Sequence, residues 1–148
     1  MLAGTYYEHS ILDYIGAERK DHQIIIPELC LRVNLDGDAP AMIHEVKTYK
    51  RKRGKVFKPP REYVQQVLVQ MYAKEREEGR PCKAEIISYA LTDAEYDNFF
   101  LPIDPKRLKH HPIAYDPVFI GEYLRRLKIL AKHIKAGTMP TMEDIENG

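Results

Sequence analysis

The chain has 148 residues, of which 44% are hydrophobic and 30% are charged, a composition typical of one globular domain that excludes wholesale disorder. No apolar run approaches the roughly 18 residues needed to span a bilayer, and the N-terminus lacks the features of a signal peptide, so we expect a cytoplasmic protein without a membrane partner. The formal net charge is only +1, and the two cysteines are too few for a disulfide framework or a four-cysteine cluster.

The spacing of apolar residues and turn formers predicts an alternation of helices and strands. Helices are indicated where apolar residues recur every three to four positions, and strands where Ile, Leu and Val are dense between turn formers. In the first part of the chain, we expect a helix over residues 5–15, a strand over 23–35 that is irregular at Pro27, a turn over 36–40 and a strand over 41–49. A loop over 51–60 then leads to a helix over 62–78, a strand over 84–91 and a partner strand over 98–103. A proline-rich loop over 102–117, a helix over 118–136 and a flexible tail over 138–148 complete the chain. This order predicts an α/β fold, with a single domain over residues 1–137 in which helices flank a small central mixed sheet that is largely antiparallel.

Positive charge is concentrated in one segment. Residues 47–58 contain seven cations and no acid, whereas the rest of the chain has 16 cations and 22 acids. A mildly acidic body with one basic segment favours a local site for a polyanion, although a solvated loop would give the same pattern. Such cations would neutralise backbone phosphates regardless of sequence. The residues expected to do so are Lys50, Arg51, Lys52, Arg53, Lys55 and Lys58.

Acidic and basic side chains come together on the expected hairpin. Side chains alternate along a strand, so Glu45 and Lys47 point to the same side, and Asp36 at the turn can approach Glu45. Two carboxylates and the backbone carbonyl of Val46 offer the oxygen ligands that Mg²⁺ favours, and the hydrated ion can deliver a water to a phosphodiester. A neighbouring lysine can orient that water or offset charge on the phosphate. The alternative for Glu45 and Lys47 is an exposed cross-strand ion pair.

Two helices carry further polar side chains that this chemistry can use. Glu8 shares the spacing of the apolar residues on the first helix, so we expect it to face the core, where a carboxylate needs a partner or a metal. A favourable position near the helix N-terminus is the alternative, and His9 is a second candidate ligand. On the long helix, Tyr63, Gln66 and Gln70 share one flank. Glutamines there can contact a phosphate or fix the attacking water, but they are also good helix formers.

Four elements, in order, resemble the PD-(D/E)xK nuclease superfamily, in its RecB-like and lambda-type exonuclease (YqaJ) branch. The last is the most specific, because it is similar to the tyrosine–glutamine–methionine–aromatic helix of lambda-type exonucleases. The resemblance covers most of the chain, from the first helix to about the fourth expected strand. The elements are Gly4-x-x-x-Glu8, Asp36-Gly37, Glu45-Val46-Lys47 and Tyr63-x-x-Gln66-Val67-x-x-Gln70-Met71-Tyr72.

The resemblance implies a restriction-endonuclease-like core, a DNA substrate, and Mg²⁺ or Mn²⁺ as cofactor. It would make Asp36 and Glu45 metal ligands, Lys47 the catalytic lysine, and Gln66 the helix residue that faces the site. Because the RecB-like branch usually has histidine where Glu8 stands, the first-helix ligand is either Glu8 or the adjacent His9. No iron–sulfur cluster is expected, because the four cysteines of the iron–sulfur nucleases are absent from the chain.

These features together predict a metal-dependent DNA nuclease, an exonuclease rather than an endonuclease, that acts in recombination, repair or phage DNA processing. One alternative is a nucleic-acid-binding or assembly subunit that keeps the fold without useful catalysis, and another is a dimeric endonuclease. Further copies of the chain and a recombination or repair protein are the other candidate partners. Because the first motif lies close to residue 1, a minimal nuclease, a subunit and a fragment all fit the sequence.

Overall fold

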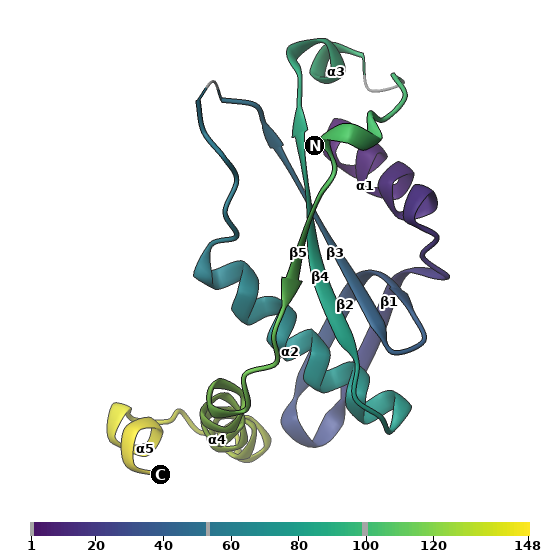
Figure 1. Ribbon diagram of the computed structural model, residues 1–148. Coiled ribbons are helices and arrows are strands. Elements are labelled where there is room, and N and C mark those ends of the chain that lie inside the picture. Colours follow the sequence, from purple (N-terminus) through teal and green to yellow (C-terminus); the bar gives the residue numbers. More distant parts are fainter. Residues whose placement is uncertain (1, 53, 99–100) are drawn as a thin grey trace.

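Residues rich in Ile, Leu and Val build a central five-stranded sheet with helices on both faces, which confirms the expected α/β fold (Figure 1). The computed structural model describes residues 2–52, 54–98 and 101–148. Its elements are α1 (Leu2–Ile15), β1 (Arg19–Ile26), β2 (Leu31–Ala39), β3 (Met42–Lys50), α2 (Arg61–Glu78), β4 (Lys83–Leu91), α3 (Asp93–Asp97), β5 (Lys109–Ile113), α4 (Pro117–Ala136) and α5 (Met142–Asn147).

The strands lie in the sheet in the order of the sequence, β1-β2-β3-β4-β5. All neighbouring pairs are antiparallel except β3 and β4, which are parallel. A parallel pair needs a crossover connection, and here the connection contains the loop over residues 51–60 and helix α2. The sheet is therefore mixed and largely antiparallel, as the sequence predicts.

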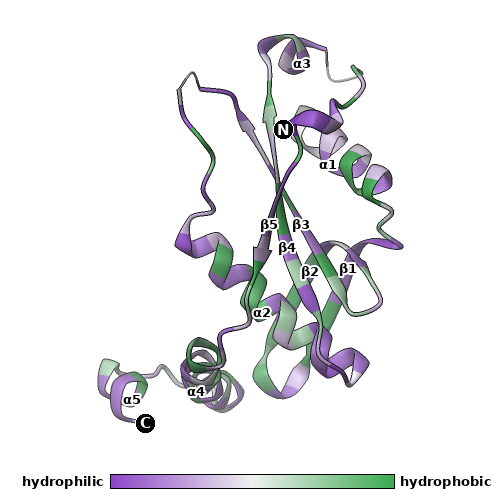
Figure 2. Ribbon diagram, viewed as in Figure 1, coloured by the Kyte–Doolittle hydropathy of each residue, from purple (hydrophilic) through white to green (hydrophobic). Residues whose placement is uncertain are grey.

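Each face of the sheet has its own apolar layer. Helix α2 covers one face, where its Val67 and Met71 belong to the same buried cluster as Ile43 and Ile86 of the sheet. Helix α1 covers the other face, and its buried Ile11 joins a second cluster with residues of β3 and β4. Figure 2 shows the corresponding hydropathy, with green along β4 and on α2 and much purple along the connection from β3 to α2. The sheet therefore lies between two helical layers.

The prediction of one strand over residues 23–35 is wrong, because these residues belong to two strands. Pro27–Leu29 form a 3-10 turn, after which Cys30 takes a left-handed conformation with φ +50°. Proline has no N–H to continue the ladder, so the chain reverses there and β1 pairs with β2 as a hairpin. The expected turn over 36–40 is also displaced: Asp36 lies inside β2, and the chain turns at Pro40 and Ala41.

The partner of β4 also differs from the expected one. Strand β5 pairs with β4 inside the region expected to be a loop, and the described residues of 98–103 form no strand. Residues 99 and 100 lie outside the described part of the chain. Proline is compatible with β5 because β5 is an edge strand, where Pro112 need not donate to a second neighbour.

The C-terminal segment, expected to be a flexible tail, contains the short helix α5. Thr141 caps this helix, because its side chain accepts a hydrogen bond from the Asp144 amide and the Asp144 side chain bonds back to the Thr141 amide. None of the helices in the described residues combines the length and the apolar character needed to cross a membrane.

Candidate metal and nucleic-acid site

The site is built where β2 and β3 stop pairing. Their ladder runs from Ala39–Met42 to Gly37–His44, and the next position of β2 is Asp36. There the Val46 amide donates to Asp36 Oδ2 at 2.9 Å, so a side chain takes the place of a backbone acceptor. Because the N–H and C=O of one residue point to the same edge of a strand, the Val46 carbonyl faces the same opening. The carboxylate of Asp36 is thereby fixed beside β3.

Glu45 is the most buried acid of the site, with only 2% of its surface exposed. Gln70 Nε2 donates to its Oε2 at 3.0 Å, Gln66 Nε2 donates to its Oε1 at 3.3 Å, and Lys47 Nζ lies 3.3 Å from the same Oε1. Burial and the Asp36 carboxylate raise the pKa of Glu45 to about 7, although Lys47 and Gln70 oppose this shift. A bound cation would therefore stabilise the ionised form of Glu45 against the effects of burial and of the Asp36 carboxylate.

Lys47 lies on the same side of β3 as Glu45, as strand alternation predicts. Its Nζ donates to Gln66 Oε1 at 3.3 Å and lies 4.3 Å from the centroid of the Tyr63 ring. Cation–π contact with a tyrosine restrains an ammonium group without removing its charge. Helix α2 therefore positions the lysine through Tyr63 and Gln66, two of the residues expected on its flank.

Helix α1 brings a third carboxyl group to the opening. Burial is the main cause that raises the pKa of Glu8 to about 7, and the nearby Asp36, Asp21 and Glu45 carboxylates add to it, as does a hydrogen bond with Asp36. Burial also raises the pKa of Asp36, even though the Val46 amide and Lys47 favour its charged form. Glu8 thus interacts with Asp36, and Asp36 with Glu45, so carboxyl groups from α1, β2 and β3 neighbour one another in turn.

His9 lies at the edge of this cluster. Its Nε2 is 3.3 Å from Asp21 Oδ2, and ligand atoms of Glu8, His9 and Asp21 all lie within 4.8 Å of one another. Both first-helix candidates are therefore near the site, with Glu8 directed at Asp36 and His9 at Asp21. Asp21 was missed by the sequence analysis, since it interrupts β1 with φ +53° and its sequence neighbours give no sign of this.

A buried ion pair aligns β2 with α2. Asp38 and Lys74 are both fully buried, and Lys74 Nζ lies 2.6 Å from Asp38 Oδ2. Asp36 lies two residues before Asp38, and Gln70 lies four residues before Lys74. Both Asp36 and Gln70 belong to the site. This contact therefore fixes the position along the sheet at which α2 presents its glutamines.

The basic segment begins within the strand that bears Lys47, because Lys50 is the last residue of β3. Lys50 and the described cations that follow it are exposed, and Arg53 lies outside the described residues. A neighbouring hollow of about 220 Å³ adds cations from the segment before β5, which the sequence analysis did not connect with the loop. The hollow is lined by Tyr49, Arg51, Lys55, Ala90, Lys106, Arg107 and Lys109.

Comparisons of the chain with protein-family models, with curated proteins and with solved structures found no significant match. The functional conclusion therefore depends on the geometry of the site.

Proposed function

We propose that the protein is a metal-dependent DNA nuclease, and the convergence of Glu8, Asp36 and Glu45 beside Lys47 is the observation that carries this proposal. Three carboxyl groups with raised pKa values form a costly arrangement unless a cation balances them. Oxygen donors alone suit Mg²⁺ or Mn²⁺. The three carboxylates and the Val46 carbonyl are the residues that would hold the ion.

The chain's own residues account for the remaining parts of phosphodiester hydrolysis. A bound divalent ion would supply Lewis-acid stabilisation of the phosphate and an activated water. Lys47, restrained by Glu45, Gln66 and Tyr63, would orient the nucleophile or offset the charge that develops on the phosphate. Gln66 is exposed beside both groups and would contact the phosphate or the water.

The charge distribution supports DNA as the substrate. Arg51 and Lys55, which follow β3, line one hollow together with Lys106 and Lys109, and Tyr49 of β3 adjoins them. Contacts from such cations neutralise phosphates without reading bases. The α/β fold, with an acidic hairpin and a crossover helix, is compatible with a restriction-endonuclease-like core.

Replacement of Lys47 tests the proposal directly. We expect Lys47→Ala to reduce Mg²⁺-dependent digestion of labelled DNA by at least about 100-fold, because a group that stabilises transition-state charge contributes about that much. Lys128→Ala, which removes an exposed lysine of α4, is the matched control and should digest DNA normally. Thermal unfolding checks that both variants fold, and digestion at the wild-type rate by folded Lys47→Ala would refute the proposal.

The same assay separates the alternative functions. An exonuclease needs a DNA end, so it digests linear DNA and leaves a covalently closed circle intact. Cleavage of the circle would instead identify an endonuclease. DNA binding that EDTA does not change, without digestion under any divalent ion, would identify a binding or assembly subunit.

A further inference from the structure

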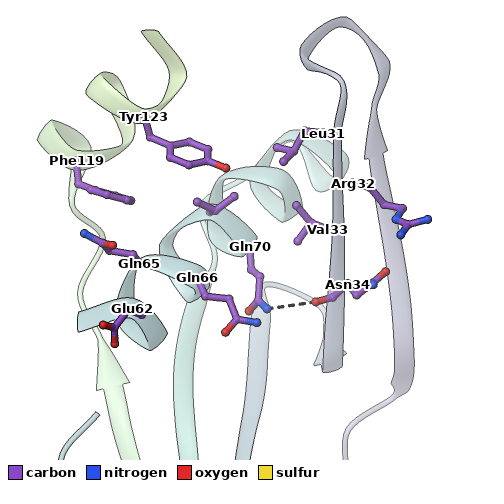
Figure 3. Close-up of a pocket in the computed structure, with 11 residues that line it drawn as sticks. Leu31, Arg32, Val33, Asn34, Glu62, Gln65, Gln66, Gln70, Phe119 and Tyr123 are labelled. Atoms are coloured by element: carbon purple, nitrogen blue, oxygen red, sulfur yellow. Dashed lines mark hydrogen bonds between the residues drawn. The ribbon is translucent and has the colours of Figure 1, made fainter. Parts of the chain in front are cut away.

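A groove opens beside the carboxylate cluster, on the side of Gln66 and Gln70 that faces α4. It has a volume of about 480 Å³, within the range of small-ligand sites. Figure 3 shows its residues coming from β2, α2 and α4. They are Leu31, Arg32, Val33, Asn34, Glu62, Gln65, Gln66, Val69, Gln70, Phe119 and Tyr123. The two shared glutamines make the groove continuous with the site.

The polar floor of the groove has an unused hydrogen-bond acceptor. Gln70 is 2% exposed, and its Nε2 donates to Glu45 Oε2 and to the Asn34 carbonyl (Figure 3), so both amide hydrogens are used. Its Oε1 is buried and has no hydrogen-bond partner among the described residues. A buried acceptor without a donor is unfavourable, and Gln65 and Gln66 add further amides to the lining. The groove therefore suits a ligand with N–H donors and carbonyl acceptors along one edge.

The wall formed by α4 is aromatic. Phe119 and Tyr123 lie one helical turn apart, with ring centroids 5.9 Å from each other and planes inclined by 32°. The side chains that carry formal charge in the lining are Arg32 and Glu62, one of each sign. This differs from the basic hollow beside Tyr49, whose lining includes five cations. A planar, uncharged ring fits the groove better than a phosphate does.

We propose that this groove accepts an unpaired nucleobase of the nucleotide next to the scissile phosphate. The inference rests on the proposed function, because the carboxylate cluster is what places a phosphate beside Gln66. Tyr123 and Phe119 provide the stacking surface, and Gln65, Gln70 and Asn34 contact the base edge. Backbone phosphates then lie on the basic segment while a base lies in the groove, so the site favours single-stranded or frayed DNA.

The test compares two short oligonucleotides with the same number of phosphates, an oligothymidylate and a fully abasic analogue. Binding is measured by fluorescence anisotropy in Mg²⁺ with Lys47→Ala, and a gel checks that both oligonucleotides stay intact. We expect the thymidylate to bind about tenfold more tightly, since stacking of a base on an aromatic side chain contributes on the order of 1.4 kcal/mol.

A second substitution locates this preference. Adding Tyr123→Ala should reduce the difference between the two oligonucleotides to less than about twofold, without changing the affinity for the abasic one. Tyr123→Leu, which keeps an apolar side chain, serves if the alanine variant does not fold, and Tyr123→Phe should retain the preference. Tyr14→Ala, at an exposed tyrosine of α1, is the aromatic control.

The outcomes separate the groove from the nuclease activity. Equal affinities for the two oligonucleotides, no binding of either, or a preference that survives loss of both Phe119 and Tyr123 would overturn the groove assignment. A preference that depends on Tyr123 in a protein that does not digest DNA would support the groove and refute the nuclease. Digestion by the wild type without any preference would refute the groove alone.

Discussion

The carboxyl group of Glu45 is subject to two opposing effects. Hydrogen bonds from Gln70 and the charge of Lys47 favour its ionised form, whereas burial and the Asp36 carboxylate favour its protonated form and prevail, since its pKa rises to about 7. A divalent cation reverses this balance, because it neutralises the charge that burial penalises. Metal binding should therefore release protons near neutral pH.

Stability without metal should reflect the same residues. Glu8 and Glu45 both have a pKa raised from 4.5 to about 7 in the folded protein. Their protonated forms therefore contribute stability that is fully present below pH 4.5 and is lost as the pH rises through about 7. In EDTA we expect the melting temperature to fall across this interval, and Mg²⁺ to restore it most strongly at the upper end. Thermal unfolding as a function of pH measures both.

Glu8→Gln provides the comparison for this profile, because it removes one of the carboxyl groups whose pKa is raised. The fall in melting temperature between pH 4.5 and 7 should become smaller in this variant. Burial lowers the pKa of His111, which opposes the trend equally in both proteins. The pKa values of Glu78 and Glu95 are lowered to about 2, so the titration of these groups changes the stability only below this interval. A profile identical to that of the wild type would show that Glu8 is not part of the cluster.

At the scale of elements, the approach of α1 to the sheet depends on a glycine. A Cβ added to Gly37 of β2 would clash with Leu12 Cδ2 and lie 3.2 Å from Ala17 Cβ. Leu12 is fully buried, so it has little room to move away. Only glycine therefore permits α1 to pack this closely, and this packing brings Glu8 to Asp36.

Gly37→Ala should displace α1 and affect both stability and the site. We expect a loss of about 1–3 kcal/mol in the free energy of unfolding, which is typical of overpacking, together with weaker Mg²⁺ binding. Chemical denaturation and a calorimetric titration measure these effects. Gly121→Ala in α4 has open space around it and should be neutral or slightly stabilising. An unfolding free energy unchanged by Gly37→Ala would mean that α1 moves aside without cost.

The elements that the sequence predicts well are those with strong local signals. Helix α2 begins one residue before the expected start and ends where expected, because its apolar stripe is regular and Gly79 takes a left-handed conformation with φ +69°. The β1–β2 hairpin was missed because Pro27 looks the same in an irregular strand and in a turn. Strand β5 was missed because its five residues, with two histidines and a proline, carry no alternation of apolar and polar residues.

The residues of the site, like the elements, could be predicted where a local pattern in the sequence positions them. Strand alternation places Glu45 beside Lys47, and helical spacing directs Glu8 toward the sheet, so these residues could be predicted. Asp21 and Tyr123 could not, because each reaches the site only through tertiary packing: Asp21 through a local distortion of β1, and Tyr123 through the position of α4. Periodicity describes one element at a time and does not describe which elements meet.

Over the whole molecule, the densest run of positive charge lies on the surface that continues from the site. Arg51 and Lys55 line one hollow with Lys106 and Lys109, so segments about 50 residues apart in the sequence form one basic surface. A polyanion bound there would displace condensed counterions, and its affinity would depend steeply on salt. The location of the charge therefore supports the proposed DNA binding better than the net charge of +1 does.

Removing two cations from this surface should change the salt dependence. We expect Lys52→Ala combined with Lys55→Ala to lower the slope of log affinity against log salt by about 1.4 to 1.8, because each phosphate contact contributes about 0.7 to 0.9. Binding titrations at several salt concentrations give the slope. Lys128→Ala combined with Lys132→Ala, at exposed residues of α4, is the matched control. Equal slopes for both pairs would place the DNA elsewhere.

Between β2 and β3, the Val46 amide is held by the Asp36 carboxylate instead of by a neighbouring strand. Its exchange with deuterium should therefore depend on how firmly one side chain is anchored, unlike that of amides within the ladders. A bound cation that fixes Asp36 should slow this exchange, and Asp36→Ala should accelerate it. A single backbone position would then report the loading of the site by nuclear magnetic resonance, with no nucleic acid present.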